Sequence, residues 1–224
     1  MSKNIENFLD TPQIEQGNWV TATSHQKLGS VYRDIVSSFQ ETSDHSDIVL
    51  ALAKATNAYD ASTVEHSERI IYITEAIAHR LGCSREEVRT IRWAALLHDI
   101  GKIGVPIQIL HKPGPLSESE WGIMRLHPAI GAEIVSQVGG LTQVARLIRS
   151  HHEKYNGTGY PDGLSGTDIP LGSRIITVAD AFGAMTEGRI YRAALSTEEA
   201  MQELIRCSGT HFDPKIVEIF LSLF

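Results

Sequence analysis

Seven histidine and aspartate side chains recur at intervals that a helical protein can bring together in one interior site. They are His66, His98, Asp99, His127, His151, His152 and Asp180. Successive positions lie 24 to 32 residues apart, about one helical hairpin per step. Imidazole nitrogens and carboxylate oxygens without thiolates suit manganese, iron, nickel or zinc. Seven ligands are too many for one tetrahedral ion and enough for two, so the pattern predicts a two-metal centre inside a helical bundle.

Lys102 and His127 have neighbours that fit such a site. If a helix continues from His98 through Gly101, Lys102 lies one turn further on the same face. A lysine beside two cations needs an anion between them, and a phosphate fits, with Lys102 binding an oxygen or helping to protonate a leaving group. His127 precedes Pro128, and proline is favoured at the first helical position, so His127 should lie where a helix begins.

Each of these residues also has an ordinary structural explanation. A buried histidine is more often a hydrogen-bonded core residue than a ligand, and Asp180 alone could cap a helix. The joint occurrence of an apolar-flanked His-Asp pair, a following lysine, a His-Pro, a His-His and a late aspartate favours a site. We assign the remaining histidines to surface or packing: His25, His45, His79, His111 and His211.

The elements that must position these residues are predicted to be helices. Helical spacing of apolar residues dominates, and alternating strand patterns are short. A serine followed three residues later by a glutamate, typical of a helix start, occurs at Ser62/Glu65, Ser84/Glu87, Ser117/Glu120 and Ser196/Glu199. The ambiguous run "SRIITVADAF" is interpreted as a helix because it has no convincing strand partner. The predicted fold class is all-α.

Length and composition limit the domain organisation and the classes of function that this chain can have. Residues 1–45 are polar, with one weak helical candidate at 26–39, and are interpreted as an N-terminal extension or linker remnant; 46–224 is predicted to form one helical domain. A net charge of -7 argues against binding nucleic-acid polymers or membrane surfaces. Cys83 and Cys207 are too few for a disulfide framework or a cysteine zinc site. With no visible signal peptide or membrane span, we expect a cytoplasmic protein with free thiols.

Six longer motifs carry a family resemblance. They are "HSERI", "AALLHDIGKIGVP", "KPGPLSESEW", "HPAIGAEI", "HHEKYNGTGYPDGLSGTDIPLGSRIITVADAF" and "GTHFDP". Together they resemble the HD-GYP family, the bacterial branch of the HD-domain metal-dependent phosphohydrolases. The resemblance implies an α-helical HD fold and a phosphodiesterase that cleaves cyclic di-GMP to linear pGpG, in some members onward to GMP. It also implies a two- or three-metal centre, often of iron or manganese.

The resemblance assigns roles to individual residues. The family's metal ligands carry over onto the seven positions that open this section, and its motif lysine onto Lys102. The GYP triplet falls on Gly159, Tyr160 and Pro161, and the basic residues that contact substrate phosphate fall on Arg189 and Arg192. The glycine-rich loop after His152 is then one wall of the substrate pocket, with Tyr160 adding a flat surface and a hydroxyl; a plain turn fixed by Pro161 is the alternative. We expect Asp99 and Lys102 to be needed for catalysis.

Four positions depart from the family pattern. Ser62 stands where trimetal members have a glutamate, which favours two metals, and Glu65 stands where glycine is common. Asn156 and Gly183 replace aspartates, removing negative charge near the site; if those carboxylates orient ligands, metal affinity falls.

Two rival functions stay open: hydrolysis of another cyclic dinucleotide such as 3′,3′-cGAMP, and a non-hydrolysing module that binds the nucleotide or a GGDEF-domain partner. A homodimer also stays open.

Overall fold

The computed structural model describes residues 45–60, 64–187 and 194–224, and within these ranges every regular element is a helix. The first half of the fold contains α2 (Ser46–Tyr59), α3 (Val64–Arg80), α4 (Arg85–Leu97), the 3₁₀-helix η1 (Ile100–Gly104), α5 (Ile107–Leu110) and α6 (Glu118–Met124). The second half contains α7 (His127–Ser136), α8 (Thr142–Arg149), the 3₁₀-helix η2 (Gly166–Asp168), α9 (Leu171–Thr186), α10 (Thr197–Arg206) and α11 (Pro214–Leu221). The all-α prediction is confirmed.

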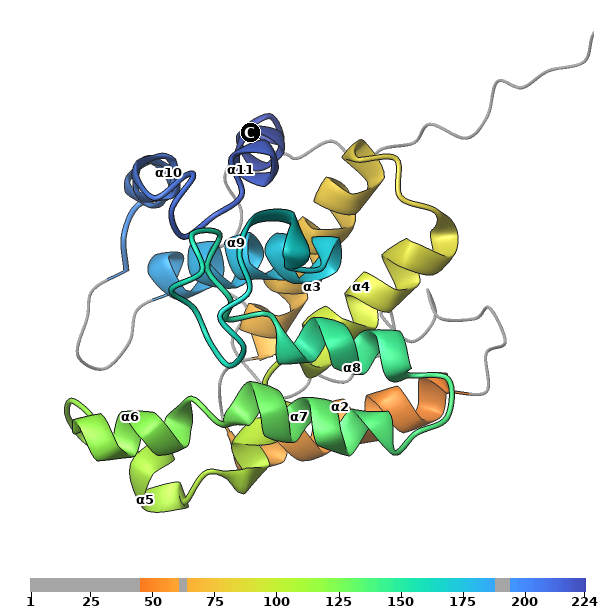
Figure 1. Cartoon of the computed structure of the whole chain (residues 1–224), viewed down its shortest axis with the longest axis vertical. Coiled ribbons are helices and arrows are strands. Elements are labelled where there is room, and N and C mark those ends of the chain that lie inside the picture. The colour runs from red at the N-terminus through yellow and green to blue at the C-terminus, as the bar shows by residue number, and fades with distance from the viewer. Residues whose placement is uncertain (1–44, 61–63, 188–193) are drawn as a thin grey trace, which may run out of the picture.

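The helices pack in pairs around one hydrophobic core. α3 packs against α4 and α9, α7 packs against α8 and η1, and α4 also contacts α8. Figure 1 shows α5 and α6 at one end of the molecule and α10 and α11 at the other. Fully buried residues such as Ile77, Leu97, Ile148, Ile176 and Phe220 come from five of these helices. Burial of one such side chain stabilises the fold by about 1.5–3 kcal/mol.

Three of the four predicted capping boxes begin helices. At α4, the Ser84 side chain accepts a hydrogen bond from the Glu87 amide at 3.3 Å, and Glu87 Oε2 accepts one from the Ser84 amide at 2.8 Å. Ser117 caps α6 and Ser196 caps α10 in the same way. The fourth box falls on Ser62, outside the described residues.

The run that could have been a strand lies within α9, as predicted. Ile175, Ile176 and Val178 are fully buried there, which explains why the sequence is apolar enough to resemble a strand. α2 begins at Ser46. The extension and its helical candidate at 26–39 lie outside the described residues, so the domain division stays a prediction. Among the helices that the structure describes, none is long and apolar enough to span a bilayer.

Candidate metal centre

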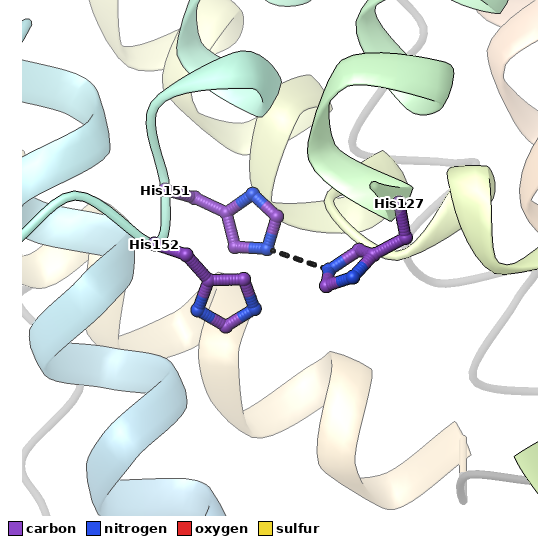
Figure 2. A group of neighbouring side chains, drawn as sticks. All are labelled: His127, His151 and His152. Carbon is purple, nitrogen blue, oxygen red and sulfur yellow. Dashed lines mark hydrogen bonds between the residues drawn. The ribbon is translucent and has the colours of Figure 1, made fainter. Parts of the chain in front are cut away.

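The seven predicted ligands come from five places in the fold and meet in its interior. His66 lies in the first turn of α3, and Asp180 lies in the second half of α9. The others lie at helix ends: His98 and Asp99 directly follow α4, His127 is the first residue of α7, and His151 and His152 follow α8. Figure 2 shows the rings of His127, His151 and His152 converging on one space.

The ligands form two groups. The ligand atoms of His127, His151 and His152 all lie within 4.8 Å of one another, as do those of His66, His98 and Asp180. Within the first group, the Nε2 atoms of His127 and His151 are 3.4 Å apart. Within the second, His66 Nε2 lies 3.4 Å from Asp180 Oδ1. Each group has the size and donor type of a divalent-cation site.

Asp99 lies between the two groups. Its Oδ2 is 3.3 Å from Nε2 of His98, and its Oδ1 is 3.5 Å from Nε2 of His127. One carboxylate therefore directs an oxygen toward each group, the arrangement that a bridging ligand of two ions requires. The close packing that allows this depends on Gly101, where an added Cβ would lie 1.8 Å from the His127 carbonyl oxygen. Only glycine lets η1 approach the start of α7 so closely.

Three of the histidines are oriented by the backbone. Nδ1 of His98, His127 and His151 lies 2.6–2.8 Å from the carbonyl oxygen of the residue three positions earlier. A carbonyl can only accept, so Nδ1 carries the proton of the neutral ring and Nε2 presents its lone pair to the site. Such outer contacts fix the tautomer and orientation of metal-binding histidines.

His66 has a side-chain contact instead. Its Nδ1 lies 2.9 Å from Glu187 Oε2, while its Nε2 faces Asp180. The same ring lies against Gly183, where an added Cβ would be 3.2 Å from Nδ1 and Cε1. The sequence suggested that Gly183 removes negative charge here; the structure shows that Glu187, one turn later, supplies a carboxylate to this ring. Glu187 was missed, and its only sequence signal is its helical spacing from Asp180.

The protonation states largely suit metal binding. Burial opposes ionisation of Asp99, but the charges of Lys102 and His98 hold the pKa of this carboxyl well below its usual range. Burial, together with the neighbouring histidines, lowers the pKa of His152 to about 4 and that of His151 well below its ordinary value. These groups are the neutral imidazoles and ionised carboxylate that a cation needs.

His66 is different. Burial likewise favours the neutral ring of His66, but the hydrogen bond that its Nε2 donates to Asp180 and the contact with Glu187 raise the pKa of His66 to about 9. In the metal-free protein the His66 ring is therefore protonated on both nitrogens, and positively charged, at neutral pH. His66 would have to lose the proton on Nε2 in order to bind a cation.

Lys102 is held differently from the expectation. The α-helix ends at Leu97, so Lys102 lies on η1, with Nζ 2.8 Å from Asp99 Oδ2 and 2.9 Å from Asp60 Oδ2. Burial opposes the charge, but these two carboxylates raise the pKa of Lys102 above its ordinary value. The ammonium keeps its proton, which suits binding a phosphate oxygen better than protonating a leaving group. Asp60 was not predicted, because nothing near it in the sequence forms a motif.

The glycine-rich loop folds back over the segment that precedes it. Glu153 is 1 % exposed, and its Oε1 accepts hydrogen bonds from the amides of Asp162 and Gly163. A Cβ on Gly159 would lie 2.3 Å from the Lys154 amide nitrogen, so this glycine allows close approach to the protein's own backbone. Tyr160 packs on the His152 ring, with centroids 5.0 Å apart. The loop thus forms a wall beside the histidines, with Pro161 following Tyr160.

Three other positions that the sequence singled out have different outcomes. Asn156 is exposed, and its side-chain oxygen accepts hydrogen bonds from the amide and hydroxyl of Thr158. It therefore stabilises a turn of the loop, and the effect of this replacement on metal affinity stays a prediction. Arg189 and Arg192 lie outside the described residues.

Comparison with known proteins gives concordant findings. A family model described as HD domain matches residues 51–216. The chain is 41% identical over 199 residues to the cyclic di-GMP phosphodiesterase response regulator RpfG of Xanthomonas campestris pv. campestris, covering 88% of this chain and 53% of that protein. It is 40% identical over 190 residues to 3'3'-cGAMP-specific phosphodiesterase 2 of Vibrio cholerae serotype O1, covering 84% and 36%. The chain thus spans about half or less of the length of these relatives.

Solved structures give the same fold. A cyclic GMP-AMP specific phosphodiesterase of V. cholerae, V-cGAP3, superposes with a TM-score of 0.62 at 25% identity, over 79% of this chain and 47% of that one. The HD domain of the L. monocytogenes phosphodiesterase PgpH superposes with a TM-score of 0.55 at 17% identity, over 77% and 94%.

Proposed function

The chain belongs to the HD domain family, and from that premise we propose that it is a metal-dependent phosphodiesterase that hydrolyses cyclic di-GMP to pGpG, and onward to GMP if the linear product rebinds. The observation that carries the proposal is the position of Asp99, whose two oxygens lie 3.3 and 3.5 Å from histidines of two separate groups. A structural histidine cluster has no need of a carboxylate directed both ways.

The residues fit two divalent ions. We propose that His66, His98 and Asp180 would hold one and that His127, His151 and His152 would hold the other, with Asp99 placed to offer an oxygen to each. Nitrogen and oxygen donors without thiolates suit manganese, iron, nickel or zinc, and the family resemblance favours iron or manganese among them. Bound there, the ions supply the Lewis acidity that activates water at neutral pH and offsets charge on phosphoryl oxygens.

The side chains around the centre position the substrate. Lys102, held between Asp60 and Asp99, presents a permanent cation to a non-bridging phosphate oxygen. Tyr160 and the loop around it shield one side of the reacting phosphate from bulk water. Arg189 and Arg192 are proposed as further phosphate contacts on the family resemblance alone.

Two other functions are separated by the same experiment. Relatives are named for cyclic di-GMP and for 3′,3′-cGAMP, so hydrolysis of the second nucleotide is the main alternative. A non-hydrolysing module would bind a nucleotide, or a GGDEF-domain partner, without product. The GGDEF partner and the homodimer stay predictions.

The test is reconstitution of metal-free protein with manganese or iron, followed by elemental analysis and chromatography of products from both nucleotides at equal metal loading. Asp99→Ala should abolish hydrolysis and lower the metal content. Asp47→Ala, an exposed residue of α2, is the matched control and should do neither. A well-folded Asp99→Ala protein with wild-type turnover would show the proposal to be wrong. Tight nucleotide binding without product in fully metallated protein would favour the non-hydrolysing module.

A further inference from the structure

A cavity of about 310 Å³ lies beside the candidate metal centre. His152 and Tyr160 line it on the side of the centre. Trp121 of α6 and Arg125, which directly follows α6, line another side, and Lys154 and His211 belong to the remaining wall. This volume is at the lower end of the range of small-molecule pockets. It suits one nucleotide of a cyclic dinucleotide whose other part reaches the metal centre.

The aromatic wall of this cavity is built on a short helix. α6 has seven residues and no buried one, and its start is fixed by the Ser117 capping box and by an ion pair between Lys112 and Glu120 at 2.6 Å. Trp121 is 42% exposed there. A partly exposed indole in a cavity wall is a stacking surface, because a nucleobase covers its apolar face while the edge stays in water.

The accessible charge of the cavity is positive. The guanidinium of Arg125 lies 5.9 Å from the centroid of the Trp121 ring, so the two side chains form a cation–π pair. Arg125 also pairs with Glu118 at 3.3 Å, but a pair this exposed is weak and yields readily to a phosphate. The acidic member of the lining, Glu153, is 1% exposed and bound to loop amides through Oε1. In a protein of net charge -7, this cationic wall suits an anionic ligand.

We propose that Trp121 and Arg125 form a nucleotide subsite of this phosphodiesterase, in which Trp121 stacks on a purine base and Arg125, with Lys154, binds the phosphate that is not being cleaved. The inference rests on the proposed function and deepens it. Stacking tolerates any base, so the subsite strengthens binding of cyclic di-GMP and of 3′,3′-cGAMP alike. It favours dinucleotides over simple phosphodiesters, which cannot reach from the centre to the indole.

The test compares two substrates in metal-loaded protein: cyclic di-GMP, and bis(p-nitrophenyl) phosphate, a phosphodiester without a nucleoside. Loss of one base–aromatic stack weakens binding by about 5- to 150-fold. Trp121→Leu should therefore raise KM for cyclic di-GMP by that factor with little change in kcat, and Trp121→Phe should recover most of the loss. Arg125→Gln should raise the same KM by about tenfold or more. For the small diester, which does not reach the subsite, KM should stay close to its wild-type value in both the Trp121 and the Arg125 variants.

Arg146→Gln, an exposed arginine of α8, is the matched control and should leave both KM values unchanged. Circular dichroism and the thermal midpoint verify that each variant is folded. Equal losses on both substrates, or a wild-type KM in the Trp121→Leu protein, would overturn the subsite. If the wild-type protein cleaves neither substrate, the proposed function fails by itself, and calorimetry with a phosphorothioate analogue of cyclic di-GMP still decides whether the Trp121 and Arg125 variants bind more weakly.

Discussion

Replacing Glu187 tests whether the candidate centre is organised around bound metal. Glu187 Oε2 lies 2.9 Å from His66 Nδ1, and the opposite nitrogen of that ring faces Asp180. Loss of a carboxylate that orients a ligating histidine costs about 10- to 100-fold in metal affinity, which is about 1.4–2.8 kcal/mol. Glu187→Ala should weaken manganese binding by this factor. Glu187→Gln keeps an oxygen acceptor without the charge, so its loss should be smaller.

The assay is competition between apo-protein and a chelator of known affinity for Mn²⁺, with His66→Ala as the benchmark for loss of a ligand. Glu86→Ala serves as the control, because the Glu86 side chain is 82% exposed and pairs only loosely with Arg89, at 3.8 Å. Both Glu187 variants should melt as the wild-type apo-protein does to within a few degrees. If folded Glu187→Ala binds Mn²⁺ with wild-type affinity, the carboxylate does not orient His66 as a ligand and the reasoning fails.

Two further predictions concern Lys102 and the start of α4. Asp60→Asn removes one of the two charges that hold Lys102 and should lower kcat about tenfold with unchanged manganese content; an unchanged kcat would show that Asp99 positions the lysine alone. Ser84→Ala removes the cap of α4 and should lower the free energy of unfolding by about 1 kcal/mol in urea titrations at pH 7. Hydrogen bonds from the Ser84 amide and hydroxyl lower the pKa of Glu87. Alanine keeps the amide and removes only the hydroxyl, whose bond to the carboxylate contributes fully above the unfolded pKa of about 4.3 and is lost as pH falls through the lower folded value. The difference between wild type and variant should therefore shrink at pH 3, and a constant difference would contradict this.

The sequence predicted the helices and the convergence of the ligands because both depend on local patterns. Capping boxes are complete within four residues, and Ser84 and Ser117 begin helices as expected. The His98-Asp99 pair lies at the end of an amphipathic helix whose apolar face determines which side turns inward. Such local patterns can be recognised in the sequence without knowledge of the rest of the fold.

Asp60 and Glu187 could not be predicted in this way. Asp60 acts on Lys102 from 42 residues away, and Glu187 acts on His66 across more than a hundred positions. Neither residue has a neighbour that marks it, since a single carboxylate at a helix end is ordinarily a solvated charge. Their roles follow only from how α2 packs beside η1 and α9 beside α3. Trp121 was part of a recognised motif, but its place in a cavity wall likewise required the packed structure.

The position of the histidines at helix ends gives a physical reason for the fold of the site. The last carbonyl groups of an α-helix have no partner within the helix. Nδ1 of His98, His127 and His151 contacts such carbonyls in the last turns of α4, α6 and α8, respectively. The same hydrogen bonds therefore satisfy carbonyl groups at the helix ends and direct three Nε2 lone pairs inward. No additional side chain is needed to orient these three rings. His66 lies at the beginning of a helix, where the first turn presents N–H groups instead, and its Nδ1 contacts a carboxylate. The outer contact of His66 is thus a side chain, which mutation can remove without changing the backbone, and for this reason Glu187 is a sensitive probe of the centre outside its ligands.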